Sequence, residues 1–255
     1  LPFVRGVFSF ADSMILGMRT LSYSASFFED DEDSEPGKLE LWMDKVFGEK
    51  VEQVLMAVVM VFSVVMAIGI FMVLPLLIAN ACKQVIHSDT IMAILEGVIR
   101  IAIFIAYIKV ISRMEDIRRT FMYHGAEHKC INCIEHGMTL TVDHVRESSK
   151  QHKRCGTSFL ILVVIVSVFL YSVLPWGSIG LRVLFKLLLL PLVMGISYEL
   201  LKWCGRSDNL ATRIIRQPGI WVQHLTVFEP DDSMIEVAIA AVTPVLPENP
   251  EEGKW

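Results

Sequence analysis

Cysteine is scarce in this sequence, and a surplus of positive charge is absent. The five cysteines are an odd number, and three of them fall in a polar central segment, residues 113–157. This usage argues against a disulfide framework and favours reduced thiols or metal ligands. The formal net charge of −5 gives no reason to expect nucleic acid as a partner. No cleavable signal peptide is evident either, because charged residues run through the first 25 positions.

Apolar residues, in contrast, are abundant. They make up 53% of the chain, and the mean hydropathy of +0.52 is high for a soluble protein. Four hydrophobic stretches of about 17 residues or more are long enough to cross a hydrocarbon core of about 30 Å. They are residues 54–81, 90–112, 158–174 and 179–203. We therefore expect an all-α polytopic membrane protein with about four transmembrane helices, the first kinked at Pro75.

The N-terminal residues 1–52 are expected to form two amphipathic helices separated by an acidic loop. The narrow polar stripe of the first helix consists of Arg5, Ser9, Asp12 and Arg19. Three charges on this stripe favour an interfacial or re-entrant position, and a helix packed against the bundle is the alternative. Residues 29–37 form the acidic loop, and residues 38–52 form the short helix that leads into the membrane.

The rest of the chain is organised in pairs of spans. Two spans lie in residues 53–112 and two in 158–203, with the polar segment between them and a C-terminal segment, 204–255, after them. Basic residues concentrate in the polar segment and after the fourth span, whereas the short connections within each pair carry almost none. The positive-inside rule therefore predicts a cytoplasmic helical layer and places both termini in the cytoplasm.

Ionisable residues inside the expected spans are a second notable feature. Glu96 and Arg100 are four residues apart in the second span, and Glu199 lies near the end of the fourth. Charges in lipid are costly and usually face a bundle interior or water. We expect Glu96 to pair with Arg100, with a substrate groove as the alternative. Arg182 and Lys186, near the start of the fourth span, are expected to reach the outer headgroups.

The strongest chemical motif lies in the polar segment, in the run Tyr-His-Gly-Ala-Glu-His-Lys at 123–129. His124 and His128 are four residues apart, so a helix places both on one face, where they can share a cation. With Glu127 they form His-x-x-Glu-His, the inverse of the common zinc-peptidase motif. Two imidazoles can hold an ion such as Zn²⁺, and a nearby carboxylate can take a proton from water. We therefore predict a metal site with Glu127 as its general base.

At least one further ligand must come from elsewhere in the segment. Glu135 shares the helical face but lies about 16 Å along the axis from His124, so it suits a supporting role or a second ion. His152 and Cys155 precede the third span, and a hairpin could bring either of them back to the helix.

A rival interpretation uses the thiols. Cys130 and Cys133, together with His152 and Cys155, have a spacing typical of a closed structural zinc site, in which four ligands hold a fold. A Cys-x-x-Cys pair inside a helix is less suited to chelation than one in a turn. We therefore favour the histidine site.

Acidic residues recur after the fourth span. Glu229, Asp231 and Asp232 precede an apolar run, in which Ser233 and Glu236 fit a capping box at the start of a helix. A carboxylate that supports the metal site or binds a second ion is the alternative. The remaining expectations are a helix at 208–217, a turn at Pro218 and Gly219, and a loose tail from residue 244.

Several of these stretches together resemble a known family, the YqhQ-like bacterial membrane proteins, a family of unknown function described as predicted metal-dependent enzymes. The matching stretches are 123–129, 154–159, 190–191 with 195–199, and 229–233 with 236–238. The family pattern includes an N-terminal segment of the type Gly-Gly-Gln-Ala-Val-x-Glu-Gly that this chain does not contain, so we expect a segment upstream. The resemblance implies metal dependence and residence in a bacterial cell membrane. Cys130 and Cys133 are not part of its pattern.

Taken together, the residues and the resemblance predict a metal-dependent membrane hydrolase. Zn²⁺ or another divalent transition metal would be held by His124, His128 and either His152 or Cys155. A site at the bilayer surface, in contact with membrane lipid, suits a lipid-linked molecule or a membrane-embedded peptide as substrate. The alternatives are a non-enzymatic factor that assists insertion or assembly of membrane proteins, and a transporter that uses the intramembrane charges. No feature favours one oligomeric state.

Overall fold

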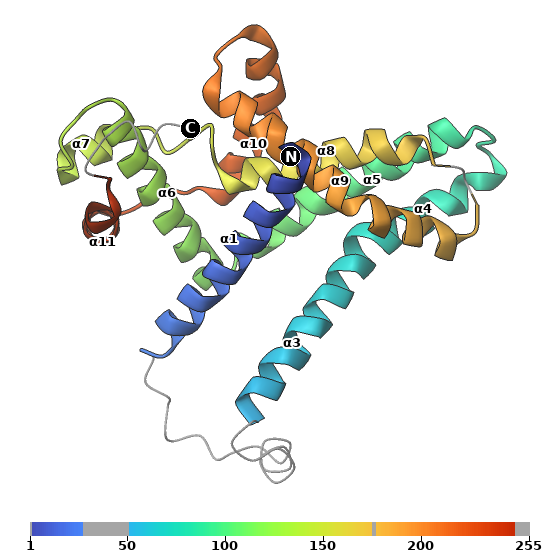
Figure 1. The fold of residues 1–255 in the computed structure, drawn as a ribbon, viewed down its shortest axis with the longest axis horizontal. Helices are drawn as coiled ribbons and strands as arrows, with labels where there is room; N and C mark the ends of the chain where they lie inside the picture. The colour runs from blue at the N-terminus through green and yellow to red at the C-terminus, as the bar shows by residue number, and fades with distance from the viewer. Residues whose placement is uncertain (1, 28–50, 175–176, 248–255) are drawn as a thin grey trace.

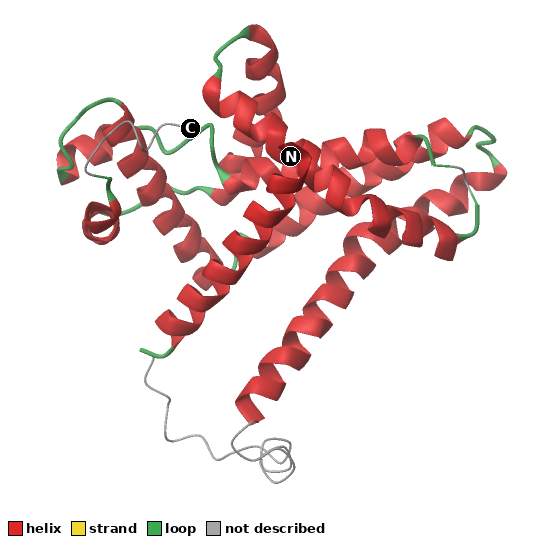
Figure 2. Ribbon diagram, viewed as in Figure 1, coloured by secondary structure: helices red, strands yellow, loops and turns green. Residues whose placement is uncertain are grey.

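The computed structural model of the protein describes residues 2–27, 51–174 and 177–247. Every regular element in these ranges is a helix, which confirms the predicted fold class (Figure 2). The acidic loop at 29–37 lies outside the described residues, as does nearly all of the helix expected at 38–52. The last eight residues of the expected tail, 248–255, also lie outside them.

Four helices pack side by side as a bundle: α4 (Leu74–Ala81), α5 (Asp89–Ile111), α8 (Gly156–Ser172) and α9 (Ile179–Arg206). Figure 1 shows the last turns of α4 and of α8 at the same end of this bundle. A polar layer lies at the other end and consists of α6 (Glu115–Glu135), α7 (Val142–Glu147), α10 (Leu210–Thr226) and α11 (Asp232–Val242). Buried Phe104, Ile108, Ile161 and Val222 join α5, α8 and α10 where the bundle meets this layer.

Two further helices, α1 (Pro2–Ala25) and α3 (Val51–Ile68), extend away from the bundle (Figure 1). The first turns of α1 pack on α9, where a Cβ at Gly6 would lie 2.8 Å from the Tyr198 Cβ. Arg5 donates to both carboxylate oxygens of Glu199, at 2.7 and 2.6 Å. Beyond these turns the apolar side chains of α1 are exposed, including Leu16 and Leu21. The helix is therefore packed at its start and free along the rest of its length.

The chain bends between α3 and α4, where the sequence predicts a kink at Pro75 (Figure 1). A π-helical turn, η2 (Gly69–Val73), precedes this proline. Proline has no N–H to donate, so the carbonyl four residues earlier, that of Phe71, loses its helical donor. Arg100 on α5 supplies the replacement, because its Nε donates to the Phe71 oxygen at 3.1 Å. A buried arginine thus satisfies the carbonyl that the kink releases.

Among the described residues, three helices are long and apolar enough to cross a membrane, one fewer than the four expected. They are Val54–Gln84, which includes α3, η2 and α4 and ends with the 3₁₀ turn η3 (Cys82–Gln84), then α5 and α9. The third expected span, 158–174, is α8, an apolar helix of 17 residues. At about 1.5 Å per residue it is about 26 Å long, short of the roughly 30 Å of a hydrocarbon core.

Of the intramembrane charges, Glu96, Arg100, Arg182 and Lys186 form one buried cluster, and Glu199 does not belong to it. Glu96 pairs with Arg100, as predicted, and also with Lys186. Arg182 Nε lies 3.5 Å from the second carboxylate oxygen. The expectation that Arg182 and Lys186 reach the headgroups is wrong, because they are 2% and 0% exposed and face Glu96 across the α5–α9 interface. Tyr171 lies beside the cluster, with Arg100 and Lys186 at 5.3 and 5.7 Å from its ring centre.

Two local predictions in the C-terminal segment need correction. The turn expected at Pro218 and Gly219 is absent, and α10 continues through both. The reason is tertiary: α10 approaches α8 so closely that a Cβ at Gly219 would lie 2.5 Å from Ser158 Oγ. The cap of α11 is Asp231, which accepts from the Met234 N–H at 2.9 Å, and not Ser233. A 3₁₀ turn, η4 (Thr243–Val245), follows α11.

Candidate metal centre

Helix α6 carries the His-x-x-Glu-His motif and ends in a turn, after which the chain runs back beside the helix. Glu115 and Asp116 in its first turn suit the positive end of the helix dipole. At the other end, Gly137 has a φ of 70°, a left-handed conformation that glycine adopts without strain. Its N–H bonds to the Ile134 carbonyl, and the next N–H bonds to Cys133, as in a Schellman motif. The reversal lets residues 146–155 run back beside α6.

The returning segment is held by side chains of α6 that donate to its backbone carbonyls. Lys129, which is 4% exposed, donates from Nζ to the Arg146 and Ser148 oxygens at 2.8 and 2.9 Å. Asn132 donates to Ser149 and Gln151, at 2.6 and 3.0 Å. The segment is therefore fixed before it reaches the start of α8, where Cys155 is the N-cap residue.

At Gly125 a third stretch of backbone, which belongs to the C-terminal segment, approaches the site. A Cβ at this position would lie 2.0 Å from the Phe228 carbonyl oxygen, so only glycine permits the approach. The Phe228 N–H bonds to the Phe121 carbonyl at 3.0 Å. This contact places Thr226, two residues earlier, against His124. The glycine between the two histidines therefore has a packing role that its sequence position alone did not reveal.

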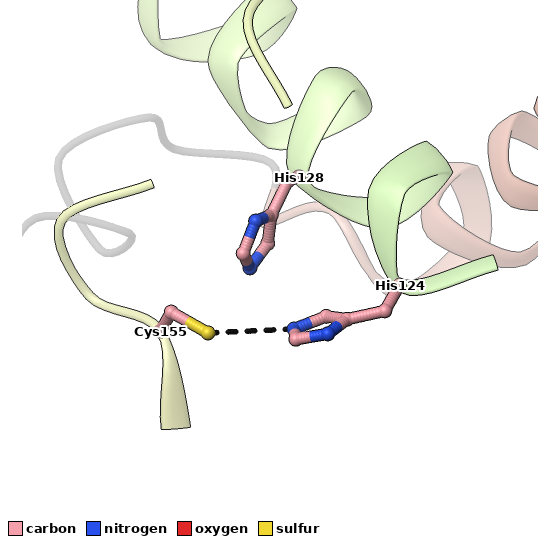
Figure 3. Close-up of side chains that lie close together, drawn as sticks. All are labelled: His124, His128 and Cys155. Carbon is pink, nitrogen blue, oxygen red and sulfur yellow. Dashed lines mark hydrogen bonds between the residues drawn. The ribbon is translucent and has the colours of Figure 1, made fainter. Parts of the chain in front are cut away.

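Three side chains meet at this junction: His124 and His128 from α6, and Cys155 from the start of α8 (Figure 3). One ligand atom of each lies within 4.8 Å of the other two. The Cys155 sulfur is 3.4 Å from His124 Nε2, and the two imidazole ring centres are 4.4 Å apart. Both His128 and Cys155 are buried, and His124 is half-buried. No other group of three such ligands occurs within residues 2–27, 51–174 and 177–247.

The backbone fixes which nitrogen of each histidine faces the centre. His124 Nδ1 lies 3.0 Å from the Thr226 carbonyl oxygen, and His128 Nδ1 lies 2.7 Å from that of Lys150. A carbonyl can only accept, so each Nδ1 carries a proton and donates it. This leaves each Nε2 directed at the shared site. Metal-binding histidines are commonly held this way, with one ring nitrogen bonded to a carbonyl and the other at the ion.

The sulfur of Cys155 is set up as a thiolate. Burial disfavours the charged form, but hydrogen bonds from His124, His128 and Thr157 outweigh it and lower the pKa of this thiol to about 5. Burial likewise opposes protonation of His124, yet the contact with Cys155 outweighs it and raises the pKa of the imidazole. In contrast, burial and the neighbouring Cys133 raise the pKa of the Cys130 thiol to about 11. Thiolate is the form that binds metal.

We predict that Cys155 of metal-stripped protein reacts with iodoacetamide at a rate that is constant between about pH 6 and pH 8. With a pKa of about 5 the thiolate is already the main species at pH 6, and reactivity falls only as the pH drops through 5. An ordinary thiol, with a pKa near 8.5, would instead gain about tenfold per pH unit over this range. Mass spectrometry of the alkylated peptide measures the rate, and Cys155→Ala identifies the signal. A steep rise between pH 6 and pH 8 would contradict the prediction.

The other predicted ligands do not join the centre. His152 is buried and its Nε2 lies 3.3 Å from a carboxylate oxygen of Glu135, which also faces Arg154 at 3.6 Å. Gln223 fixes the His152 backbone through two hydrogen bonds, at 3.0 and 2.8 Å. His152 and Glu135 thus stand beside the cluster as a pair, with the His152 ring centre 5.8 Å from that of His128.

The acidic residues of the C-terminal segment serve the fold. Glu229 pairs with Lys129 and Lys150, at 2.7 and 3.2 Å, and so joins α6 to the returning segment. Asp231 caps α11, and Asp232 makes a bidentate pair with Arg146 at 2.9 and 2.8 Å. None of these three belongs to the ligand group.

The cysteine-based alternative is not assembled. Cys130 and Cys133 are fully buried in an apolar cluster with Ala126, Val145 and Ile235, where α6 packs on α7 and α11. Cys133 Sγ donates to carbonyls of the helix-ending turn, at 3.5 and 3.8 Å. These two thiols fill the core between α6 and α11, on the side where the helix packs against its neighbours.

A cavity of about 270 Å³ opens next to the cluster. Its lining includes all three clustered side chains, the His152–Glu135 pair and Glu127. Glu127 is exposed and lies outside the ligand group, as its position about 60° from the ligand face of the helix predicts. The arrangement therefore offers three ligands, room for further groups and a carboxylate that borders the same space.

The fold and the centre together define a class: an all-helical protein with long apolar helices and a polar layer that carries a His–His–Cys cluster. The chain belongs to the family described as "Protein of unknown function (DUF1385)", whose model matches residues 1–248. It is 32% identical over 247 residues to "Uncharacterized protein YqhQ" of Bacillus subtilis (strain 168), a match that covers 96% of this chain and 77% of that protein. The YqhQ-like resemblance is therefore confirmed. No solved structure matches the chain.

Proposed function

We propose that this protein is a metal-dependent hydrolase that acts at the cytoplasmic surface of the bacterial cell membrane. The observation that carries the proposal is the junction of His124, His128 and Cys155, whose ligand atoms lie within 4.8 Å of one another beside a cavity. The two histidines and the thiolate would hold the ion, and Glu127 would act as the general base. Structural zinc sites are usually closed by four protein ligands, whereas catalytic sites keep one position open.

The donor set fits a zinc-like ion on its own chemistry. Two neutral imidazole nitrogens and one thiolate are ligands that Zn²⁺ prefers, and each histidine is already oriented by a backbone carbonyl. A bound ion would supply Lewis acidity, which polarises a substrate oxygen and lowers the pKa of water. Cys155, whose pKa is about 5, is already a thiolate at neutral pH, and a bound ion would take the place of the proton that His124 Nε2 shares with the sulfur.

The residues of this chain would move the proton. Glu127 would take a proton from the attacking water, whose oxygen forms a bond to the electrophilic carbon or phosphorus of the substrate. The bond to the leaving group then breaks, and Glu127 returns the proton to that group. One product gains OH and the other gains H, so water is the only co-reactant.

The metal content of the purified protein tests this proposal. We expect about one zinc or similar ion per chain, and a loss of that ion in the double variant His124→Ala with His128→Ala. His87→Ala is the matched control, because His87 is exposed and lies in the turn after α4, away from the polar layer. Elemental analysis measures the ion, and circular dichroism checks that the helices remain. Undiminished metal in the double variant would refute the histidine site and favour ligation by the cysteines.

The same geometry supports a second reaction class. A thiolate 3.4 Å from a histidine is also the arrangement of thiol hydrolases and acyltransferases. The sulfur would attack a carbonyl carbon, and the leaving group would depart with the proton of His124. Cys155→Ser would impair both mechanisms, because Cys155 is a metal ligand in one and the nucleophile in the other, so removal of the metal is the test that separates them. Activity that survives removal of all metal by a chelator would favour the thiol mechanism.

For the membrane arrangement we propose four spans, with α8 as the third. Two observations support this. Helix α8 lies between α5 and α9 in the bundle. The last turns of α4 and α8 also lie at the same end of the bundle (Figure 1). A helix of 17 residues can span if its ends reach the interfaces at a locally thinner bilayer. Basic residues of the polar layer then place that layer and both termini in the cytoplasm.

We predict that a cysteine at Glu147 is labelled by an impermeant maleimide only from the cytoplasmic side, and one at Gly177 only from outside. Both positions are exposed, and Gly177 has nothing within 4 Å of an added Cβ. The unsubstituted protein, treated in the same way, gives the background from its five native cysteines. Labelling of both positions from one side would rule out the four-span arrangement.

A further inference from the structure

Three cavities follow one another across the polar layer. The site cavity shares Glu135 and His152 with a second, polar cleft of about 560 Å³ that lies between α6, the 149–153 segment and α10. That polar cleft shares Gln217 with a third space, an apolar groove of about 440 Å³ along α10. The shared residues place the three spaces next to one another, in the order site cavity, polar cleft and apolar groove. The path leads from the His–His–Cys cluster, through polar surroundings, to an apolar surface.

The polar cleft carries a positive charge that the fold does not balance. Lys153, Arg216 and Gln217 line it with N–H donors, whereas the amide N–H groups of Asn132 are already used by the Ser149 and Gln151 carbonyls. Glu135 faces Arg154, and Asp208 is shared between Arg216, at 2.9 Å, and Arg213, at 3.2 Å. For half-buried Lys153, no carboxylate of the described residues lies within ion-pair distance. The combination of Lys153 with an arginine and a glutamine amide suits an anionic group with several oxygens.

The apolar groove has a different character. Ile214, Pro218 and Trp221 line it, and the Ile214 and Trp221 side chains are 64% and 62% exposed. Together with Leu210, which is 75% exposed, they form one apolar face along α10. An amphipathic helix with an exposed tryptophan on its apolar face is typical of the membrane interface. A chain lying in this groove would therefore be in contact with the bilayer.

We infer that the three cavities form the binding path of an anionic amphiphile, with its apolar tail along α10, its headgroup in the cleft at Lys153, and its reacting bond at the His–His–Cys cluster. This inference rests on the proposed hydrolase and names its substrate class: a lipid-like molecule with a phosphate or carboxylate headgroup. Hydrolysis would fall on the headgroup side, so the product that keeps the tail stays in the membrane and the other is water-soluble. A membrane-embedded peptide fits less well, because its backbone brings no charge to match Lys153.

Quenching of Trp221 fluorescence by brominated lipids tests the path. The protein is placed in phosphatidylcholine nanodiscs that contain either brominated phosphatidic acid or brominated diacylglycerol, which share the tail and differ in the phosphate. The signal of interest is the quenching that Trp221→Phe removes. We expect phosphatidic acid to bind at least about tenfold more tightly than diacylglycerol, since hydrogen bonds to a charged group are the strong ones. Lys153→Gln should remove most of that preference.

Lys83→Gln is the matched control, because Lys83 is exposed in η3 at the far end of the bundle and should leave the preference intact. Metal content is measured on the same samples. If Lys153→Gln keeps its metal but loses the preference for phosphatidic acid, the result supports the binding path independently of the metal site. Wild-type protein that contains no metal but still prefers phosphatidic acid would refute the metal-dependent hydrolase and leave the binding path standing. Equal affinity for the two lipids, or an unchanged preference in Lys153→Gln, would overturn the path. Displacement of phosphatidic acid by an amidated leucine-rich transmembrane peptide as readily as by unlabelled lipid would overturn it in favour of a peptide.

Discussion

Glu127→Gln is expected to abolish function while the protein keeps its metal and its fold. The amide has nearly the same shape as the carboxylate, but it cannot accept a proton from water. Glu127 borders the site cavity and is exposed, so its replacement leaves no buried group unpaired. Loss of a general base typically lowers the rate by about 10²–10⁴. Complementation of a strain that lacks the gene, together with metal analysis and thermal unfolding of the purified variant, measures the three properties.

The control for this variant is Glu115→Gln, an exposed glutamate in the first turn of the same helix. It removes the same charge from α6 at a distance from the cavity, and we expect function to survive. Full complementation by Glu127→Gln would support the non-enzymatic alternative, in which the metal holds a membrane factor together. Loss of both metal and fold would instead make Glu127 a structural partner of the centre.

Much of the site could be predicted from local pattern. The helix expected to carry the histidine motif is α6, Glu115–Glu135, and the four-residue spacing of His124 and His128 places both on one face. The supporting contacts could not be found in this way. The carbonyls of Thr226 and Lys150, which orient the two rings, belong to segments 102 and 22 residues away. Backbone carbonyls leave no residue-type signal, so only the assembled fold reveals them.

The sequence could not distinguish His152 from Cys155 as the third metal ligand, because both lie in the same returning segment. The structure separates them by side-chain direction. Cys155 starts α8 and faces the histidines, whereas His152 turns to Glu135. The cap of α11 shows the same limit. Asp231 and Ser233 are both residue types that cap helices well, and only the assembled backbone shows that Asp231 accepts from the Met234 N–H.

The intramembrane charges show what pattern can and cannot do. The four-residue spacing of Glu96 and Arg100 predicted their pairing, and Arg182 and Lys186 have the same spacing on α9. A snorkelling position was expected for the second pair, because nothing local indicates that α9 turns this face toward α5. The sequence did contain a signal for this contact: each of the two helices carries two charged residues four positions apart, which places them on one face. Two such charged faces can meet where the helices pack.

Glu96→Gln is expected to destabilise the protein strongly, by about 3–5 kcal/mol, because it leaves buried charges without their counter-charge. In the native bundle one carboxylate faces Arg100, Arg182 and Lys186, all at most 6% exposed. The amide cannot balance any of them. Arg100 also satisfies the Phe71 carbonyl released by Pro75, so its displacement would loosen the bend between α3 and α4 as well.

Glu199→Gln provides the comparison, since Glu199 is also a glutamate of a long apolar helix and also pairs with an arginine. Its partner, Arg5, has a side chain that is 47% exposed, and exposed pairs contribute little to stability because solvent screens their attraction. Reversible unfolding of both variants in mixed micelles should therefore give a small loss for Glu199→Gln and a large one for Glu96→Gln. Adding Lys186→Met to Glu96→Gln should recover part of the loss, because one uncompensated cation is removed. Equal losses for the two single variants, or no recovery in the double variant, would show that Glu96 does not hold the bundle together by charge.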